Sequence, residues 1–324
     1  MTSSTALVSL PASPAPLALS ELVEQANGYA ASARADNTRR AYRSDWLTFE
    51  MWCRGNGLAS LPAAPETVAL YLTHLAEQGR KAATIARALA ALSQAHRFAG
   101  FPSPRSTARV GETMRGIRRC LGVAQVGKAP VVVEHLRRMV AELPAGLLGA
   151  RDRALLALGF AGAFRRSELV ALEVADLAFT NDGLEVTLRR AKTDQEGHGR
   201  KIGIPYGSVP TLCPVRAARA WLDAAGIVRG AVLRGVNRHG QVAERCLTDR
   251  TVAVVVKRYA AAAGLDARLF AGHSLRAGFV TSAAKAGKSE RAIMAQTGHR
   301  SSTMVRRYIR DSSLFSDNAA AGLL

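Results

Sequence analysis

The sequence predicts a mainly α-helical protein with two parts, an all-helical N-terminal domain and a longer, mostly helical domain that holds one small antiparallel β-sheet. Three observations lead to this fold class. Apolar residues recur at three- and four-residue steps along most of the chain, whereas strand-type signals occur in one place. The length of 324 residues exceeds what one hydrophobic core usually serves. A weakly periodic stretch containing glycine and proline interrupts the helical pattern after residue 121.

The N-terminal domain is expected over residues 20–122. A tail, residues 1–19, precedes it and is expected to be disordered because it is rich in Ser, Ala and Pro. Four helices are expected: the first has Asn37 and Thr38 as candidate caps, and the others start at Pro65, Ala82 and Thr107. Residues 123–132 then predict an interdomain linker, with an ordinary helix–helix loop as the alternative.

The second domain is expected over residues 133–324. Its helices are expected over residues 133–143, 150–160, 168–175 (with Ser167 as the cap), 214–225, 249–263, 274–286, 289–297 and 302–310. The sheet is expected from residues 184–188 and 201–205, with a polar hairpin loop between them. The C-terminal tail, residues 311–324, carries four large apolar side chains among small residues. We expect it to dock onto a neighbouring protomer, and a frayed chain end is the alternative.

The net charge of +19 points to an anionic partner, because such an excess of like charge opposes a compact fold unless it is neutralised. Residues 1–127 hold 14 basic and 8 acidic side chains, and residues 128–324 hold 30 and 17. Because both parts are basic, we expect both to contact the same nucleic acid.

The remaining composition predicts a cytoplasmic protein. Four cysteines lie far apart, which argues against a zinc site or a disulfide framework and fits a reducing compartment. No apolar run reaches the roughly 20 residues that cross a bilayer. The first 19 residues lack the basic segment of a secretory signal, so no membrane partner is expected.

Side chains that handle phosphate recur along the second domain. They lie in Phe164-Arg165-Arg166-Ser167-Glu168, Ala191-Lys192-Thr193-Asp194, His273-Ser274-Leu275-Arg276, Thr297-Gly298-His299 and Arg306-Arg307-Tyr308. Two arginines can grip the nonbridging oxygens of a phosphodiester as charge develops on them. A tyrosine can attack the phosphorus if nearby cations stabilise its phenolate. The set therefore predicts metal-free attack on a DNA phosphate.

Each candidate has a distinct role. Arg165 and Arg276 are the expected phosphate clamp, and Tyr308 is the expected nucleophile. The other candidates are His273 as the acceptor of the tyrosine proton, His299 as a hydrogen-bond donor to the phosphate, Lys192 as the acid for the departing 5′-oxygen, and Glu168 as the group that orients an arginine or a histidine. Taken singly, each could be a surface charge, a helix cap or a core residue, so the prediction depends on the whole set.

The order and spacing of these residues resemble the tyrosine recombinase (phage-type integrase) family over residues 131–310. The family's Gly-Leu-Arg-x-Ser-Glu-Leu motif matches with Ala163 and Phe164 in its first two positions. The hairpin lysine, the His-x-x-Arg box, the Gly-His pair and the nucleophile match Lys192, His273 with Arg276, Gly298 with His299, and Tyr308. Ala277 stands where many members have histidine. Residues 20–122 resemble, more loosely, the family's SAM-like core-binding domain, as in two-domain Cre-like or Xer-like members.

The resemblance implies a site-specific recombinase. Tyr308 would form a 3′-phosphotyrosine and release a 5′-hydroxyl, and two rounds of strand exchange would pass through a Holliday junction without metal, ATP or other cofactor. The implied partner is double-stranded DNA with specific recombination sites, bound by a dimer on each site and a tetramer on two. The implied location is the cytoplasm, in association with the nucleoid, for a protein of bacterial or phage type. Two alternatives stay open: a type IB topoisomerase or telomere resolvase, and a DNA-binding protein that does not cleave.

Overall fold

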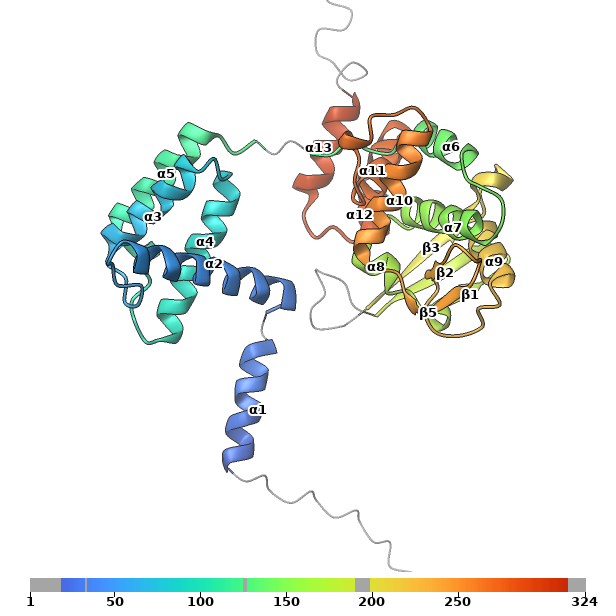
Figure 1. Cartoon of the computed structure of the whole chain (residues 1–324). Coiled ribbons are helices and arrows are strands. Elements are labelled where there is room, and N and C mark those ends of the chain that lie inside the picture. The colour runs from blue at the N-terminus through green and yellow to red at the C-terminus, as the bar shows by residue number, and fades with distance from the viewer. Residues whose placement is uncertain (1–18, 33, 125–126, 190–198, 314–324) are drawn as a thin grey trace, which may run out of the picture. The chain divides into compact units, whose positions relative to one another are not determined.

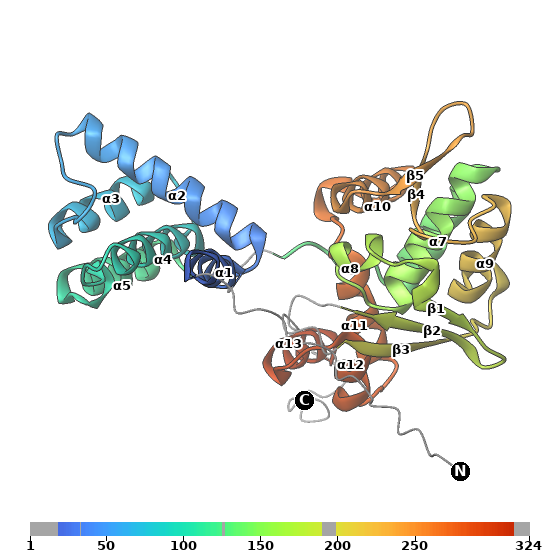
Figure 2. The ribbon, with the colours of Figure 1, turned by 90° about the horizontal axis from the view of Figure 1, so that it is seen from below.

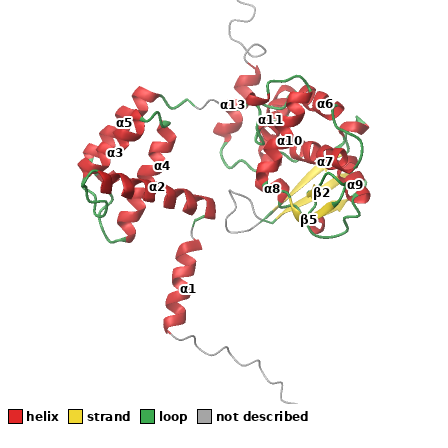
Figure 3. Cartoon of the chain, in the orientation of Figure 1, coloured by secondary structure: helices red, strands yellow, loops and turns green. Residues whose placement is uncertain are grey.

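The computed structural model describes residues 19–32, 34–124, 127–189 and 199–313, most of which are helical (Figures 1 and 3). The predicted mainly α fold class is confirmed. The chain divides into two compact units, Met1–Gln125 and Val126–Leu324. None of the described helices has the length and apolar character needed to cross a membrane. Of the predicted tail, residues 1–18 lie outside the described residues, and Leu19 already begins a helix.

The first unit is all-helical. Its helices are α1 (Leu19–Ser32), α2 (Asp36–Gly55), α3 (Pro65–Glu77), α4 (Ala82–Phe98) and α5 (Ala108–Leu121). Helices α2 to α5 pack together around buried side chains that include Phe49, Tyr71, Leu92 and Val110 (Figure 2). Helix α1 adds to the four expected helices, and α2 starts one residue before the expected cap Asn37.

The second unit surrounds a central helix. Its helices are α6 (Val133–Ala141), α7 (Leu147–Ala161), α8 (Arg166–Val170), α9 (Pro214–Ala224), α10 (Asp249–Ala262), α11 (Ser274–Lys285), α12 (Glu290–Thr297) and α13 (Ser302–Ser313). Helix α7 is buried along most of its length, since α9 and α11 both pack against it. Within this core Tyr259 donates a 2.8 Å hydrogen bond to the fully buried Asp152, which also pairs with Arg151 at 2.6 Å. The network joins α7 to α10.

Two antiparallel sheets complete this unit. Strands β1 (Leu177–Phe179), β2 (Gly183–Leu188) and β3 (Arg200–Pro205) form the first, with Val186 opposite Ile202 and Leu188 opposite Arg200. The predicted pairing of residues 184–188 with 201–205 is therefore confirmed. Strands β4 (Arg234–Val236) and β5 (Val242–Cys246) form a second sheet that the sequence did not predict. Their short length and largely exposed residues leave no period-two pattern to detect.

The helix predicted over residues 168–175 is wrong at both ends, because α8 covers only Arg166–Val170. Arg165, not Ser167, is the residue that caps it, since the Glu168 carboxylate accepts the Arg165 backbone N–H at 2.9 Å. Beyond Val170 the backbone pairs with a distant loop. The Val174 N–H donates to the Gly230 carbonyl at 2.8 Å, and the Leu172 carbonyl accepts from Val232 at 2.9 Å. These bonds replace those of a continued helix.

Candidate active site

Arg276 is the buried centre of the candidate site. It lies in the first turn of α11, and its side chain is only 2% exposed. Its Nη1 donates to the Ala163 carbonyl at 2.6 Å, and its Nη2 lies 3.2 Å from His299 Nε2. Burial, and next the like charge of Arg165, lower the pKa of Arg276 to about 10, so the guanidinium stays charged at neutral pH. This buried cation is held rigidly on two sides.

Arg165 is fixed by its neighbour Glu168. The Arg165 Nη1 donates to Glu168 Oε1 at 2.6 Å, while Glu168 Oε2 accepts the Arg165 backbone N–H. Glu168 is 5% exposed, so this ion pair is largely removed from water. The structure thus shows the expected contact of Glu168 with an arginine. Since the charge of Arg165 acts on Arg276, the two guanidinium groups lie within electrostatic range of each other.

His299 follows the C-terminal end of α12, where Gly298 adopts a left-handed conformation with φ of 67°. Its Nδ1 lies 2.7 Å from Thr297 Oγ1, and the Thr297 hydroxyl lies 2.7 Å from the Ile293 carbonyl, to which it donates. Because that hydroxyl proton is used, the histidine proton is assigned to Nδ1, and Nε2 accepts from Arg276. Burial, followed by the charge of Arg276, lowers the pKa of His299 to about 4, so the ring is neutral at neutral pH.

Tyr308 and His273 complete the described part of the set. Tyr308, on α13, packs at the edge of a small cluster formed by Val280, Ile293 and Val305, and lies close enough to Arg276 for a phenolate there to act on the guanidinium. His273 is the N-cap residue of α11, and its charge acts on His299. Helices α11, α12 and α13 therefore bring both histidines, Arg276 and the tyrosine into one electrostatic neighbourhood.

Lys192 lies outside the described residues, so the structure does not place it. Two other residues belong to the site and were missed by the sequence prediction. Thr297 fixes the His299 ring, and Arg200, at the start of β3, interacts electrostatically with Arg165, Glu168 and His299. Thr297 lies in the quoted Thr297-Gly298-His299 segment, but no role was assigned to it, although its contact with His299 is local. The position of Arg200 depends on contacts with the distant helix α12.

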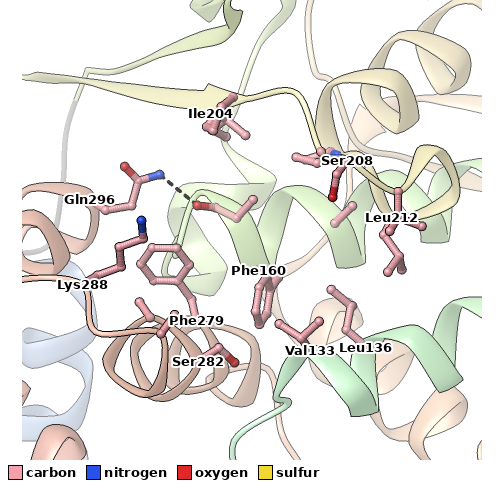
Figure 4. Close-up of a pocket in the computed structure, with 18 of the residues that line it drawn as sticks. Val133, Leu136, Phe160, Ile204, Ser208, Leu212, Phe279, Ser282, Lys288 and Gln296 are labelled. Carbon is pink, nitrogen blue, oxygen red and sulfur yellow. Dashed lines mark hydrogen bonds between the residues drawn. The ribbon is translucent and has the colours of Figure 1, made fainter.

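An apolar cavity of about 570 Å³ lies on the second unit, and none of the predicted site residues that the structure describes lines it. Figure 4 shows it between α6, α7, β3, α11 and α12, with Val133, Leu136, Phe160, Ile204 and Phe279 on its walls. The Gln296 amide closes one side by donating to the Ala161 carbonyl at 2.9 Å. The cavity is large enough for a ligand or for apolar side chains of another segment.

Comparisons with known proteins identify the family. The sequence profile of the Phage integrase family matches residues 132–313, and that of the Phage integrase, N-terminal SAM-like domain matches residues 29–100. An integrase/recombinase xerD homolog of Selenomonas ruminantium is 46% identical over 292 residues, which cover 89% of this chain and 85% of that protein. Tyrosine recombinase XerC of Pelotomaculum thermopropionicum is 30% identical over 261 residues, 75% of this chain and 76% of that protein.

Solved structures share the fold. A lambda integrase tetramer bound to a Holliday junction has a TM-score of 0.59 at 18% identity, with 93% of this chain and 79% of that chain covered. XerH site-specific recombinase bound to palindromic difH substrate has a TM-score of 0.57 at 18% identity, with 80% and 71% covered. The predicted SAM-like fold of the first unit is confirmed by its profile match. With a family profile over more than half its length and relatives at 46% and 30% identity, the chain belongs to the phage integrase family and is a tyrosine recombinase.

Proposed function

We propose that this protein cuts and rejoins double-stranded DNA at specific sites, with Tyr308 as the nucleophile and Arg165 and Arg276 as the phosphate clamp. One observation carries the proposal: a buried, charged Arg276 contacts His299 and lies within electrostatic range of both Arg165 and Tyr308. A phosphate bound there would neutralise a cluster of guanidinium groups that repel each other. The net charge of +19 supports DNA as the source of that phosphate.

The steps follow from the chemistry of each group. Tyr308 attacks the phosphorus and forms a 3′-phosphotyrosine, while the bond to the 5′-oxygen breaks and that oxygen takes a proton from Lys192. His273 receives the phenolic proton. As the phosphorus becomes five-coordinate, Arg165, Arg276 and His299 stabilise the charge on its nonbridging oxygens. Attack by the 5′-hydroxyl of a partner strand reverses the reaction and releases the enzyme.

The two parts of the chain would divide the work. Residues 20–122 would act as the core-binding domain, residues 133–324 as the catalytic domain, and residues 123–132 as the linker. Exposed basic side chains of the first unit, including Arg39, Arg40 and Arg43 on α2, are suited to the DNA backbone. The cytoplasmic, nucleoid-associated location stays a prediction.

Covalent trapping tests this function. A nicked duplex carrying the target site loses a short oligonucleotide on cleavage, so rejoining is blocked and the protein–DNA adduct accumulates. We expect an adduct that survives denaturation, with the nucleotide attached to the peptide containing Tyr308 when digested protein is analysed by mass spectrometry. No adduct, or attachment to a different residue, would contradict the proposal. The target site is obtained by sequencing DNA that copurifies with the protein.

We also propose that the protein works as a dimer on each site and as a tetramer on two sites, assembled through the C-terminal tail. The tail offers Leu314, Phe315, Leu323 and Leu324, and residues 314–324 lie outside the described part of the chain. The apolar cavity in the second unit is a suitable acceptor for such side chains from a neighbouring protomer. The lambda integrase relative was solved as a tetramer on a Holliday junction.

Removing the tail or filling the cavity should weaken assembly by similar amounts. We expect truncation after Ser313 and the Ala283→Trp variant each to lower two-site complex formation by about 10- to 100-fold, since each loses the burial of one or two large apolar side chains. Adduct formation on a single site serves as the control and should persist. The measurement is native gel electrophoresis with DNA carrying one or two sites. Unchanged assembly of both variants would favour a frayed end.

A further inference from the structure

Arg200 is the first residue of β3, and its side chain binds the end of the distant helix α12. Its Nη1 donates to the Ala295 carbonyl at 3.1 Å and to the Gln296 carbonyl at 3.0 Å. Both carbonyls belong to the last turn of α12, where backbone oxygens lack partners within the helix. A cation also complements the negative end of the helix dipole. The contact therefore fixes the turn that leads directly to His299.

The Arg200 guanidinium leaves no room for a side chain at position 298. A β-carbon added at Gly298 would lie 2.8 Å from Arg200 Cζ and 2.9 Å from its Nε. Its φ of 67° also favours glycine over any larger residue. The Arg200 side chain thus packs against the residue that immediately precedes His299, and the close approach of the two requires glycine at that position.

The charge of Arg200 is hard to explain by stability alone. Burial lowers the pKa of Arg200, the opposite charge of Glu168 offsets part of this, and the like charge of Arg165 lowers the pKa further. The charge of Arg200 acts in turn on Arg276 and His299. Its Nη2 is buried and makes no hydrogen bond with any residue that the structure describes. A half-buried cation close to a second arginine, with a buried donor that has no partner among the described residues, costs folding free energy. Such a cost is typical of residues kept for the geometry of a functional site.

We propose that Arg200 is a positioning residue of the phosphate site, which holds the Thr297–Gly298–His299 turn so that His299 stays in contact with Arg276. The inference rests on the catalytic roles proposed above. Loss of the Arg200 hydrogen bonds would free the end of α12, and the ring of His299 would sample positions away from the phosphate. Arg200 itself need not touch the DNA.

The test compares Arg200→Met with Lys201→Met. Lys201 is the next residue of β3, its side chain is 74% exposed, and it pairs with Glu185 at 3.3 Å, so its variant removes the same charge from outside the site. At saturating protein we expect Arg200→Met to form the adduct about 10- to 100-fold more slowly than wild type, as a misplaced catalytic group does. DNA affinity should fall no further than in Lys201→Met. A cleavage rate for Arg200→Met equal to that of Lys201→Met would overturn the inference.

A double-mutant cycle identifies the route of the effect. If Arg200 acts through His299, Arg200→Met should slow cleavage little further once His299→Ala is present. If the double variant is slowed by the product of the two single effects, Arg200 does not act through His299, and the inference is overturned. Arg200→Lys keeps a donor for the two carbonyls and should recover part of the rate, and it replaces Arg200→Met in the cycle if that variant does not fold. If Arg200→Lys cleaves no faster than a folded Arg200→Met protein, the positioning role of the Arg200 hydrogen bonds is contradicted.

Failure of this inference is distinguishable from failure of the proposed function. If wild-type protein forms an adduct at Tyr308 while Arg200→Met reacts equally fast, the function stands and the positioning role falls. If wild-type protein forms no adduct, the function itself falls, and the Arg200 comparison ends with it.

Discussion

Tyr308→Phe is expected to lower adduct formation by more than about 10⁴-fold, because it removes the only atom of that side chain that can bond to phosphorus. The change deletes one oxygen and leaves the ring that packs beside Val280, Ile293 and Val305. Folding and DNA binding should therefore persist. The measurement is single-turnover cleavage of the nicked substrate, together with DNA affinity and the thermal midpoint of each protein.

Tyr206→Phe is the matched control for this experiment. Tyr206 lies just after β3 on the same unit, is 37% exposed, and stacks beneath the Arg216 guanidinium at 5.4 Å from its ring centroid. Its hydroxyl takes no part in the candidate site, so cleavage should match wild type. A Tyr308→Phe protein that still forms the adduct would show that another side chain is the nucleophile.

Much of this organisation could be predicted because it depends on local sequence. Pro65 and Ala82 begin α3 and α4 as expected, and Thr248 and Ser289 cap α10 and α12 through their side chains. The candidate residues were detectable for a related reason, since they lie in short sequence motifs with fixed spacing. His273 and Arg276 fall in one turn, so their proximity follows from helical geometry.

The features that were missed depend on tertiary contacts. Arg200 resembles any basic residue at the edge of a loop until β3 brings it to the end of α12, 95 residues away in sequence. The end of α8 was predicted five residues too late, because it is set by backbone hydrogen bonds to Gly230 and Val232. The neutral state of His299 likewise depends on burial and on Arg276. A linear pattern contains none of this information.

The structure also explains why position 276 holds an arginine rather than a lysine. The Arg276 guanidinium uses separate nitrogens for the Ala163 carbonyl and for His299, and a planar fork is needed to reach both. An ammonium would reach one partner at most. It would also be more easily neutralised, because burial lowers the pKa of lysine from a much lower starting value.

Arg276→Lys is therefore expected to slow cleavage by about 10²- to 10³-fold, the usual effect of losing one preorganised donor to developing charge. Affinity for DNA should change far less, since many other basic groups are available to contact the backbone. The number of phosphate contacts obtained from the salt dependence of affinity should fall by at most about one. Arg268→Lys is the control, because the Arg268 side chain is 90% exposed and pairs with Asp266. Cleavage rates and salt-dependent binding are measured on the same substrate. If Arg276→Lys instead weakens binding while the saturated cleavage rate stays normal, Arg276 binds the ground state and the transition state equally, and the clamp for the developing charge must be sought in another residue.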